Sequence, residues 1–138
     1  MQYLLDTDTL SYIMKKRSPF HTKVLNKLLN VSPADVYISS ITVAEITLGI
    51  YKLPPNQRYN LRQIILGFTQ NMNILEFDIN AAWLYGMVRA GLQNNGTDIG
   101  IADTQIAAHA LSNQLVLVTN NVRHFDRVDS LKLDNWTI

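Results

Sequence analysis

Short apolar stretches alternate with longer segments of helical periodicity along the whole chain. The apolar stretches contain many β-branched and aromatic residues and lack strict alternation, which is typical of strands covered on both faces. Four of them predict buried strands, at 3–5, 36–38, 74–77 and 115–118. A weaker fifth candidate lies near 136–138.

The segments between these stretches have the apolar spacing of helices. The predicted helices cover 9–16, 20–29, 41–53, 58–70, 79–94 and 101–112. Strands that alternate with helices predict an α/β domain built around a parallel sheet. Because no linker, repeat or low-complexity stretch interrupts the pattern, we expect residues 1–138 to form a single domain.

Polar residues occur where the predicted strands end. Asp6 directly follows the first strand, and Glu45 lies about one turn into the helix after the second. Asp103 lies near the N-terminus of the helix before the fourth strand, while Thr119 and Asn121 follow that strand. In a parallel sheet these places meet at one edge, which is where ligands bind to such folds.

Each acid also has a local structural interpretation. Asp6 fits the N-cap of the first helix. Glu45 completes a capping-box pattern with Thr42. Asp103 suits the first turn of its helix, where an acid complements the helix dipole. Its helix face is otherwise small and apolar, however, and a carboxylate there is costly to bury without a cation or hydrogen-bond donors.

Three acids at one edge repel one another, and proteins seldom gather them without a cation. Oxygen ligands without His or Cys suit Mg²⁺ or Mn²⁺. Such an ion activates water and stabilises the transition state of phosphoryl transfer. We therefore expect Asp6, Glu45 and Asp103 to hold Mg²⁺ or Mn²⁺, with Asp8 and Asp98 in supporting positions.

Composition excludes several classes of site. The chain has no cysteine, which rules out disulfides, a thiolate zinc site and a cysteine nucleophile. No apolar run reaches the ~18 residues of a membrane span. The N-terminus lacks the basic start of a signal peptide, so we expect a cytoplasmic protein.

The net charge of +1 is far from that of a strongly basic nucleic-acid-binding domain. The charge is unevenly distributed, because residues 1–62 carry +4 and the remainder −3. This excess of positive charge suits a partner with phosphates, and it equally fits an ordinary solvated surface. Lys15, Lys16 and Arg17 are candidates for contacts with RNA phosphates, although cations also suit a solvated helix end.

Four segments resemble the PIN-domain nucleases and, within them, the VapC toxins of bacterial toxin–antitoxin pairs. The matching segments are 3–11, 39–49, 99–110 and 117–125, in the order and spacing of the family. The resemblance implies a three-layer α/β/α fold and Mg²⁺-dependent endonucleolytic cleavage of RNA. It also implies a VapB-like antitoxin and a homodimer, and it places Asp6, Glu45 and Asp103 as the acidic triad.

The sequence departs from the family pattern at two positions. Many PIN domains carry a fourth acid where this chain has Asn121, and relatives often have an acid where it has His124. An amide oxygen ligates a cation or holds a water molecule but adds no charge. These two departures do not involve the acidic triad. They leave open whether the site binds one divalent cation or two.

Two other α/β functions fit part of the pattern. The run from Asp6 to Asp8 also occurs in phosphatases that form an aspartyl phosphate. A phospho-receiver domain, which is not an enzyme, has the same size and an acidic pocket at the same edge. Both need a lysine near the pocket, and none lies at the end of the strand at Val118, where Arg123 is the nearest cation. Labelling by a small phosphodonor would distinguish them from a nuclease.

Overall fold

The computed structural model describes residues 1–138 and contains one parallel five-stranded sheet in the order β3-β2-β1-β4-β5. The strands are β1 (Tyr3–Leu5), β2 (Val36–Ser39), β3 (Asn73–Leu75), β4 (Val116–Val118) and β5 (Leu133–Asp134). The register aligns Tyr3 with Val36 on one side and with Val116 on the other. The four main strand predictions are confirmed, although β3 ends two residues early.

The fifth strand was predicted in the wrong place. β5 ends at Asp134, and the apolar signal after it comes from Trp136, which is a buried core residue. The Trp136 ring packs edge-on against Tyr3 at 5.3 Å, and its indole N–H donates to Asp134 Oδ2 at 3.1 Å. Burial of this side chain, and not strand pairing, therefore explains the pattern.

Seven α-helices surround the sheet. They are α1 (Thr7–Met14), α2 (Phe20–Leu29), α3 (Ser40–Tyr51), α4 (Tyr59–Asn71), α5 (Ile79–Asn94), α6 (Ile101–Ser112) and α7 (Val122–Phe125). The bounds of α2, α5 and α6 are those predicted. α1 begins earlier than predicted because Asp6 caps it, with Oδ1 accepting from the Thr9 N–H at 2.8 Å. The single-turn α7 is too short to show a periodicity.

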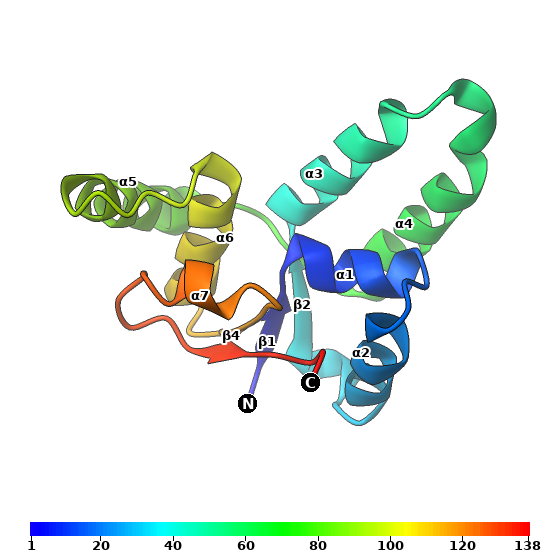
Figure 1. The fold of residues 1–138 in the computed structure, drawn as a ribbon, viewed down its shortest axis with the longest axis horizontal. Helices are drawn as coiled ribbons and strands as arrows, with labels where there is room; N and C mark the ends of the chain where they lie inside the picture. Colours follow the sequence, from blue (N-terminus) through cyan, green and yellow to red (C-terminus); the bar gives the residue numbers. More distant parts are fainter.

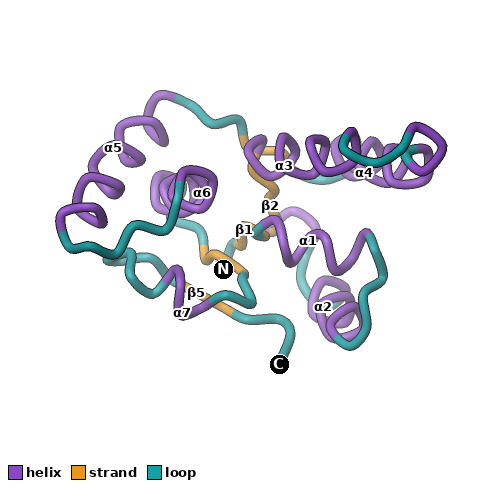
Figure 2. The backbone as a smooth tube through the Cα atoms, turned by 45° about the horizontal axis from the view of Figure 1, so that its top comes forward, coloured by secondary structure: helices purple, strands orange, loops and turns teal.

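The helices form two layers, as expected of an α/β/α fold. Figure 1 and Figure 2 show α1 to α4 on one side of the sheet and α5 to α7 on the other. Neighbouring residues of β1 face opposite layers: Leu5 packs with Leu10 of α1, and Leu4 packs with Ile106 of α6. Both leucines are fully buried, so the sheet is covered on both faces.

Helices α3 and α4 form a hairpin, here called the α3–α4 arm (residues 40–71), that extends beyond the edge of the sheet (Figure 1). Pro54 and Pro55 lie at its outer end, where the chain reverses between the helices. The inner end of α3 directly follows β2, so the arm starts at the carboxyl edge of the sheet.

The helices of the protein are all too short or too polar to cross a lipid bilayer.

Candidate functional site

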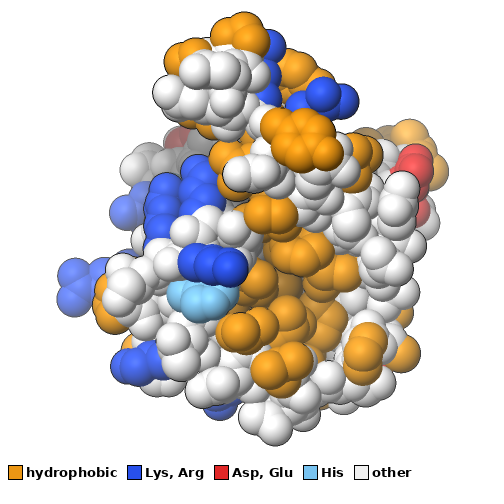
Figure 3. Space-filling model, turned by 90° about the vertical axis from the view of Figure 1, so that its right-hand side faces the viewer, with side chains coloured by type: hydrophobic (Ala, Val, Ile, Leu, Met, Phe, Trp, Pro, Cys, Tyr) orange, Lys and Arg blue, Asp and Glu red, His pale blue; other side chains and the backbone are white.

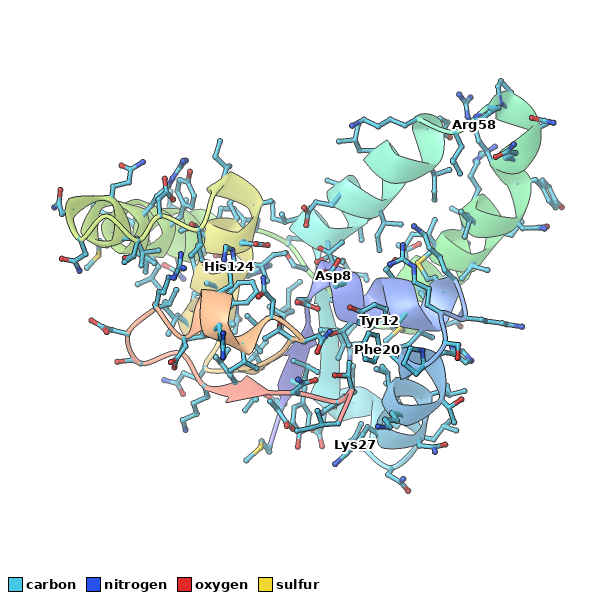
Figure 4. The ribbon with its side chains drawn as sticks, in the orientation of Figure 1. Asp8, Tyr12, Phe20, Lys27, Arg58 and His124 are labelled. Atoms are coloured by element: carbon cyan, nitrogen blue, oxygen red, sulfur yellow. The ribbon has the colours of Figure 1, made fainter.

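The carboxyl edge of the sheet contains a cavity of about 250 Å³ lined almost entirely by polar residues. The lining residues are Asp6, Thr7, Asp8, Glu45, Asp103, Asn121 and Phe125. They come from the start of α1, from α3, from the first turn of α6 and from the segment after β4. Figure 4 shows Asp8 at the start of α1 and His124 in α7 on this edge. The structure thus brings together the three acids of the predicted triad, with Asp8 and Asn121 beside them.

Asp6 is the most deeply buried of the acids, with only 5% of its surface exposed. Burial raises the pKa of Asp6 to about 6, because the charged form loses its hydration. Hydrogen bonds from Thr119 and Thr9 lower this pKa, and the nearby charge of Asp8 raises it slightly. Burial, and not repulsion within the cluster, is therefore the main cause of the shift.

The side chain of Glu45 lines the cavity and does not cap the N-terminus of α3. α3 begins after Ser39, whose Oγ accepts from the Ile41 N–H at 3.0 Å. The capping box predicted with Thr42 is therefore wrong, because both residues lie inside the helix. Instead, Glu45 Oε1 accepts a hydrogen bond from the Thr7 hydroxyl, which fixes the carboxylate at the cavity wall.

Asp103 is half-buried and is held by His124, a partner that the sequence did not reveal. His124 Nε2 lies 2.8 Å from Asp103 Oδ2 and 3.1 Å from the carbonyl oxygen of Ile99. Because a carbonyl oxygen only accepts, this nitrogen carries a hydrogen and donates to Asp103. Burial raises the pKa of Asp103, and His124 partly offsets this effect. The only sequence signal was the unusual residue at position 124.

Two predicted supporting residues lie outside the cavity wall. Asp98 accepts from Arg89 at 3.4 Å and from Gln93 at 3.3 Å. Its other oxygen accepts from the Gly100 N–H at 3.0 Å, which fixes the residue before α6. Asp98 therefore anchors the helix of Asp103 from outside the cavity lining, and its predicted supporting role stays a prediction. Thr119 is buried beneath the cavity, bonded to Asp6 and to the Asn121 N–H.

The three predicted RNA-contacting cations lie at the far end of α1. Lys15 and Arg17 line a groove of about 240 Å³ between α1 and the α3–α4 arm, whereas Lys16 does not. This groove shares Thr7, Asp8 and Glu45 with the acidic cavity, so the two are continuous. Its floor is apolar, formed by Met14, Ile46, Ile50, Leu53 and Leu61.

The donor set of the cavity fits a hard divalent cation. All its candidate ligands are carboxylate or amide oxygens, which are the ligands of Mg²⁺ and Mn²⁺. No three acidic or His side chains are drawn together tightly enough to enclose an ion alone. Mg²⁺ does not require this, since it keeps several waters and uses one or two carboxylates. No lysine lines the cavity, in contrast to what an aspartyl-phosphate chemistry needs.

Known proteins resemble this chain along almost its whole length. Residues 3–131 match the PIN domain family. The tRNA(fMet)-specific endonuclease VapC of Salmonella typhimurium is 35% identical over 99% of this chain and 98% of its own. Ribonuclease VapC2 of Haemophilus influenzae is 37% identical over the same shares.

Two solved complexes contain chains with this fold. The chain matched in DNA-bound VapBC from Salmonella typhimurium gives a TM-score of 0.87 at 32% identity, covering 99% of this chain and 98% of that one. The chain matched in VapBC-1 from nontypeable Haemophilus influenzae gives 0.86 at 32% identity, with both chains fully covered.

Proposed function

The chain belongs to the PIN-domain family, as its match to the family and its VapC ribonuclease relatives show, and from this premise we propose its function. It is a divalent-cation-dependent endoribonuclease and the toxin of a type II toxin–antitoxin pair. The observation that carries the proposal is the single cavity shared by Asp6, Glu45 and Asp103. Its oxygen-only lining supports Mg²⁺ or Mn²⁺ as the cofactor.

Three hydrogen bonds, one from a backbone N–H and two from side chains, prepare the cavity for a cation. Thr9 fixes one oxygen of Asp6, Thr7 fixes one oxygen of Glu45, and His124 fixes one oxygen of Asp103. The second oxygens of Glu45 and Asp103 are available for Mg²⁺ or Mn²⁺, and the side chain of Thr119 also holds the carboxylate of Asp6 in place. When bound there, the ion supplies activation of water and neutralisation of the scissile phosphate. Asn121 and Asp8 would position water at the rim.

The substrate that we propose is a structured RNA, with tRNA as the first candidate. A relative with 35% identity is named as a tRNA(fMet)-specific endonuclease. Phosphates approaching the acidic cavity need compensating cations, and Lys15 and Arg17 supply them in the adjoining groove. Specific fragments from bulk tRNA, mapped at their ends, support this function, whereas intact tRNA under both Mg²⁺ and Mn²⁺ contradicts it.

The proposed antitoxin is a VapB-like protein that covers the acidic cavity. The structures that this chain resembles are VapBC complexes. Figure 3 shows hydrophobic side chains in a hollow below the arm, bordered by Lys and Arg side chains. An apolar segment of a partner fits the groove floor, and an Arg or Lys of the partner suits the carboxylates. Self-association, which light scattering measures, stays a prediction.

Glu45→Gln is expected to weaken this complex by at least about tenfold, because it removes a charge that a buried cation of the antitoxin would face. Calorimetric titration of the VapB-like partner measures the effect. Asp129→Asn, an exposed change elsewhere, is the matched control. Equal affinity of wild type and Glu45→Gln would place the antitoxin away from the cavity.

A further inference from the structure

The outer end of the α3–α4 arm carries exposed aromatic rings and cations that the acidic cavity does not use. We define the arm tip as Tyr51, Lys52, Arg58, Tyr59 and Arg62. Resting on the ribonuclease function proposed above, we propose that the arm tip is a second RNA-docking site. Tyr51 stacks on an unpaired base there, and the neighbouring arginines bind the phosphates beside that base.

The rings and guanidinium groups of the tip are already arranged for stacking. The Tyr51 ring lies 5.3 Å from the Arg58 guanidinium and 6.0 Å from that of Arg62, yet 53% of Tyr51 is exposed. Two nitrogens of Arg58 donate to the carbonyl oxygens of Leu53 and Tyr51, at 2.9 and 3.1 Å. These bonds fix Arg58 and leave its third nitrogen free for a phosphate.

The charge of the arm favours a polyanion. From Ile46 to Leu75 the chain has three cations and no acid. None of the Lys and Arg residues up to Arg62 forms a salt bridge, because the only ion pairs are Arg89 with Asp98 and His124 with Asp103. Figure 4 shows Arg58 at the outer end of the arm, far from Asp8 at the sheet edge. This charge is therefore not compensated within the protein.

Aromatic rings beside arginines favour single-stranded nucleic acid over other polyanions. Single-stranded bases stack on Tyr and on guanidinium planes, and phosphates pair with the same arginines. An acidic protein segment would use the cations but would leave the exposed Tyr51 ring without a partner. The combination therefore points to unpaired nucleotides.

The arm tip lies on the path of an RNA that enters the acidic cavity. Glu45, Leu48 and Tyr51 are spaced three residues apart, so each lies beside the one before it, and together they span about 120° of the surface of α3. Leu48 is 59% exposed, and Tyr51 lies about 9 Å beyond Glu45 along the helix axis. On the same side, Ile41 packs against the core cluster that contains Ile106 of α6. The inner end of this surface therefore faces α6, and Leu48 and Tyr51 continue it from the cavity to the arm tip.

Binding of bulk tRNA in excess chelator tests the docking site without cleavage. Fluorescence anisotropy is expected to show about tenfold weaker binding for Tyr51→Ala, because one base loses its stacking platform. Tyr51→Phe keeps the ring and should bind within twofold of wild type. Arg62→Gln should lower the slope of log affinity against log salt concentration by about one, because one phosphate contact is lost. Lys132→Gln, an exposed residue near β5, is the charge-matched control.

The outcomes separate this proposal from the ribonuclease function. Tyr51→Ala binding within twofold of wild type, together with an unchanged salt slope in Arg62→Gln, overturns the docking site and leaves the arm as a surface for proteins. Cleavage by the wild type is measured separately in Mg²⁺. Tyr51-dependent binding without any cleavage would support the docking site and overturn the ribonuclease function. Should Tyr51→Ala fail to fold, Arg62→Gln decides, since the Arg62 side chain is exposed and makes no hydrogen bond.

Discussion

Asp6→Asn and Asp103→Asn are each expected to slow RNA cleavage by about a thousandfold, because each removes one charged ligand of the cation. The substitutions nearly preserve side-chain volume. Asn also accepts a hydrogen bond at an N-cap, so Asp6→Asn keeps its contact with the Thr9 N–H. Single-turnover cleavage of tRNA measures the effect on the chemical step.

Asp129→Asn is the control for these two variants. It makes the same change of Asp to Asn at an exposed position that does not line the acidic cavity, and it should cleave at the wild-type rate. Cleavage at wild-type rates by both Asp6→Asn and Asp103→Asn would remove the acidic cavity from the reaction, whatever the family of the protein.

Asp6→Asn is also expected to raise the melting temperature of the metal-free protein by several degrees at pH 8. The folded-state pKa of Asp6 is raised from 3.8 to about 6, so the folded protein holds this proton more tightly than the unfolded chain. The resulting stability is present below about pH 4 and is lost as pH rises through 6. The loss is about 3 kcal/mol, and a neutral Asn does not incur it.

The pH dependence of this effect provides its control. At pH 3.5 Asp6 is protonated in the folded protein and mostly protonated in the unfolded chain, so wild type and Asp6→Asn should melt at similar temperatures. Asp103→Asn should gain less at pH 8, because it weakens the bond to His124. Saturating Mg²⁺ should stabilise the wild type more than either variant, since only the native state binds the ion. A lower melting temperature for Asp6→Asn at pH 8 would mean that the charged carboxylate itself stabilises the fold.

The sequence predicted the sheet and the main helices because their signals are local. The strands around Leu4, Ile38 and Leu117 are short apolar runs, and α5 and α6 have clear apolar periodicity. Trp136 gave a misleading strand signal because a buried aromatic ring outside a strand has the same local pattern. The single turn of α7 lacked any such signal.

The sequence predicted which residues meet at the candidate site, because chain order places them at one sheet edge. It did not predict the hydrogen-bond partners of their side chains. The strand ends place Asp6, Glu45 and Asp103 at one edge from the chain order alone. Their partners depend on side-chain directions, so His124 was not assigned to Asp103. For the same reason, the sequence placed Asp98 in a supporting position without indicating its contacts with Arg89 and Gly100. The relative importance of burial and repulsion at Asp6 also required the three-dimensional structure.

The central claim is that the oxygen-lined cavity holds a divalent cation that RNA cleavage requires. The most direct measurement is the rate of tRNA cleavage by purified wild-type protein in EDTA, followed by titration with excess Mg²⁺ or Mn²⁺. We expect no cleavage in EDTA, full recovery on adding either ion, and no recovery in Asp6→Asn at the same concentrations. Undiminished cleavage by the wild type in EDTA would contradict the claim.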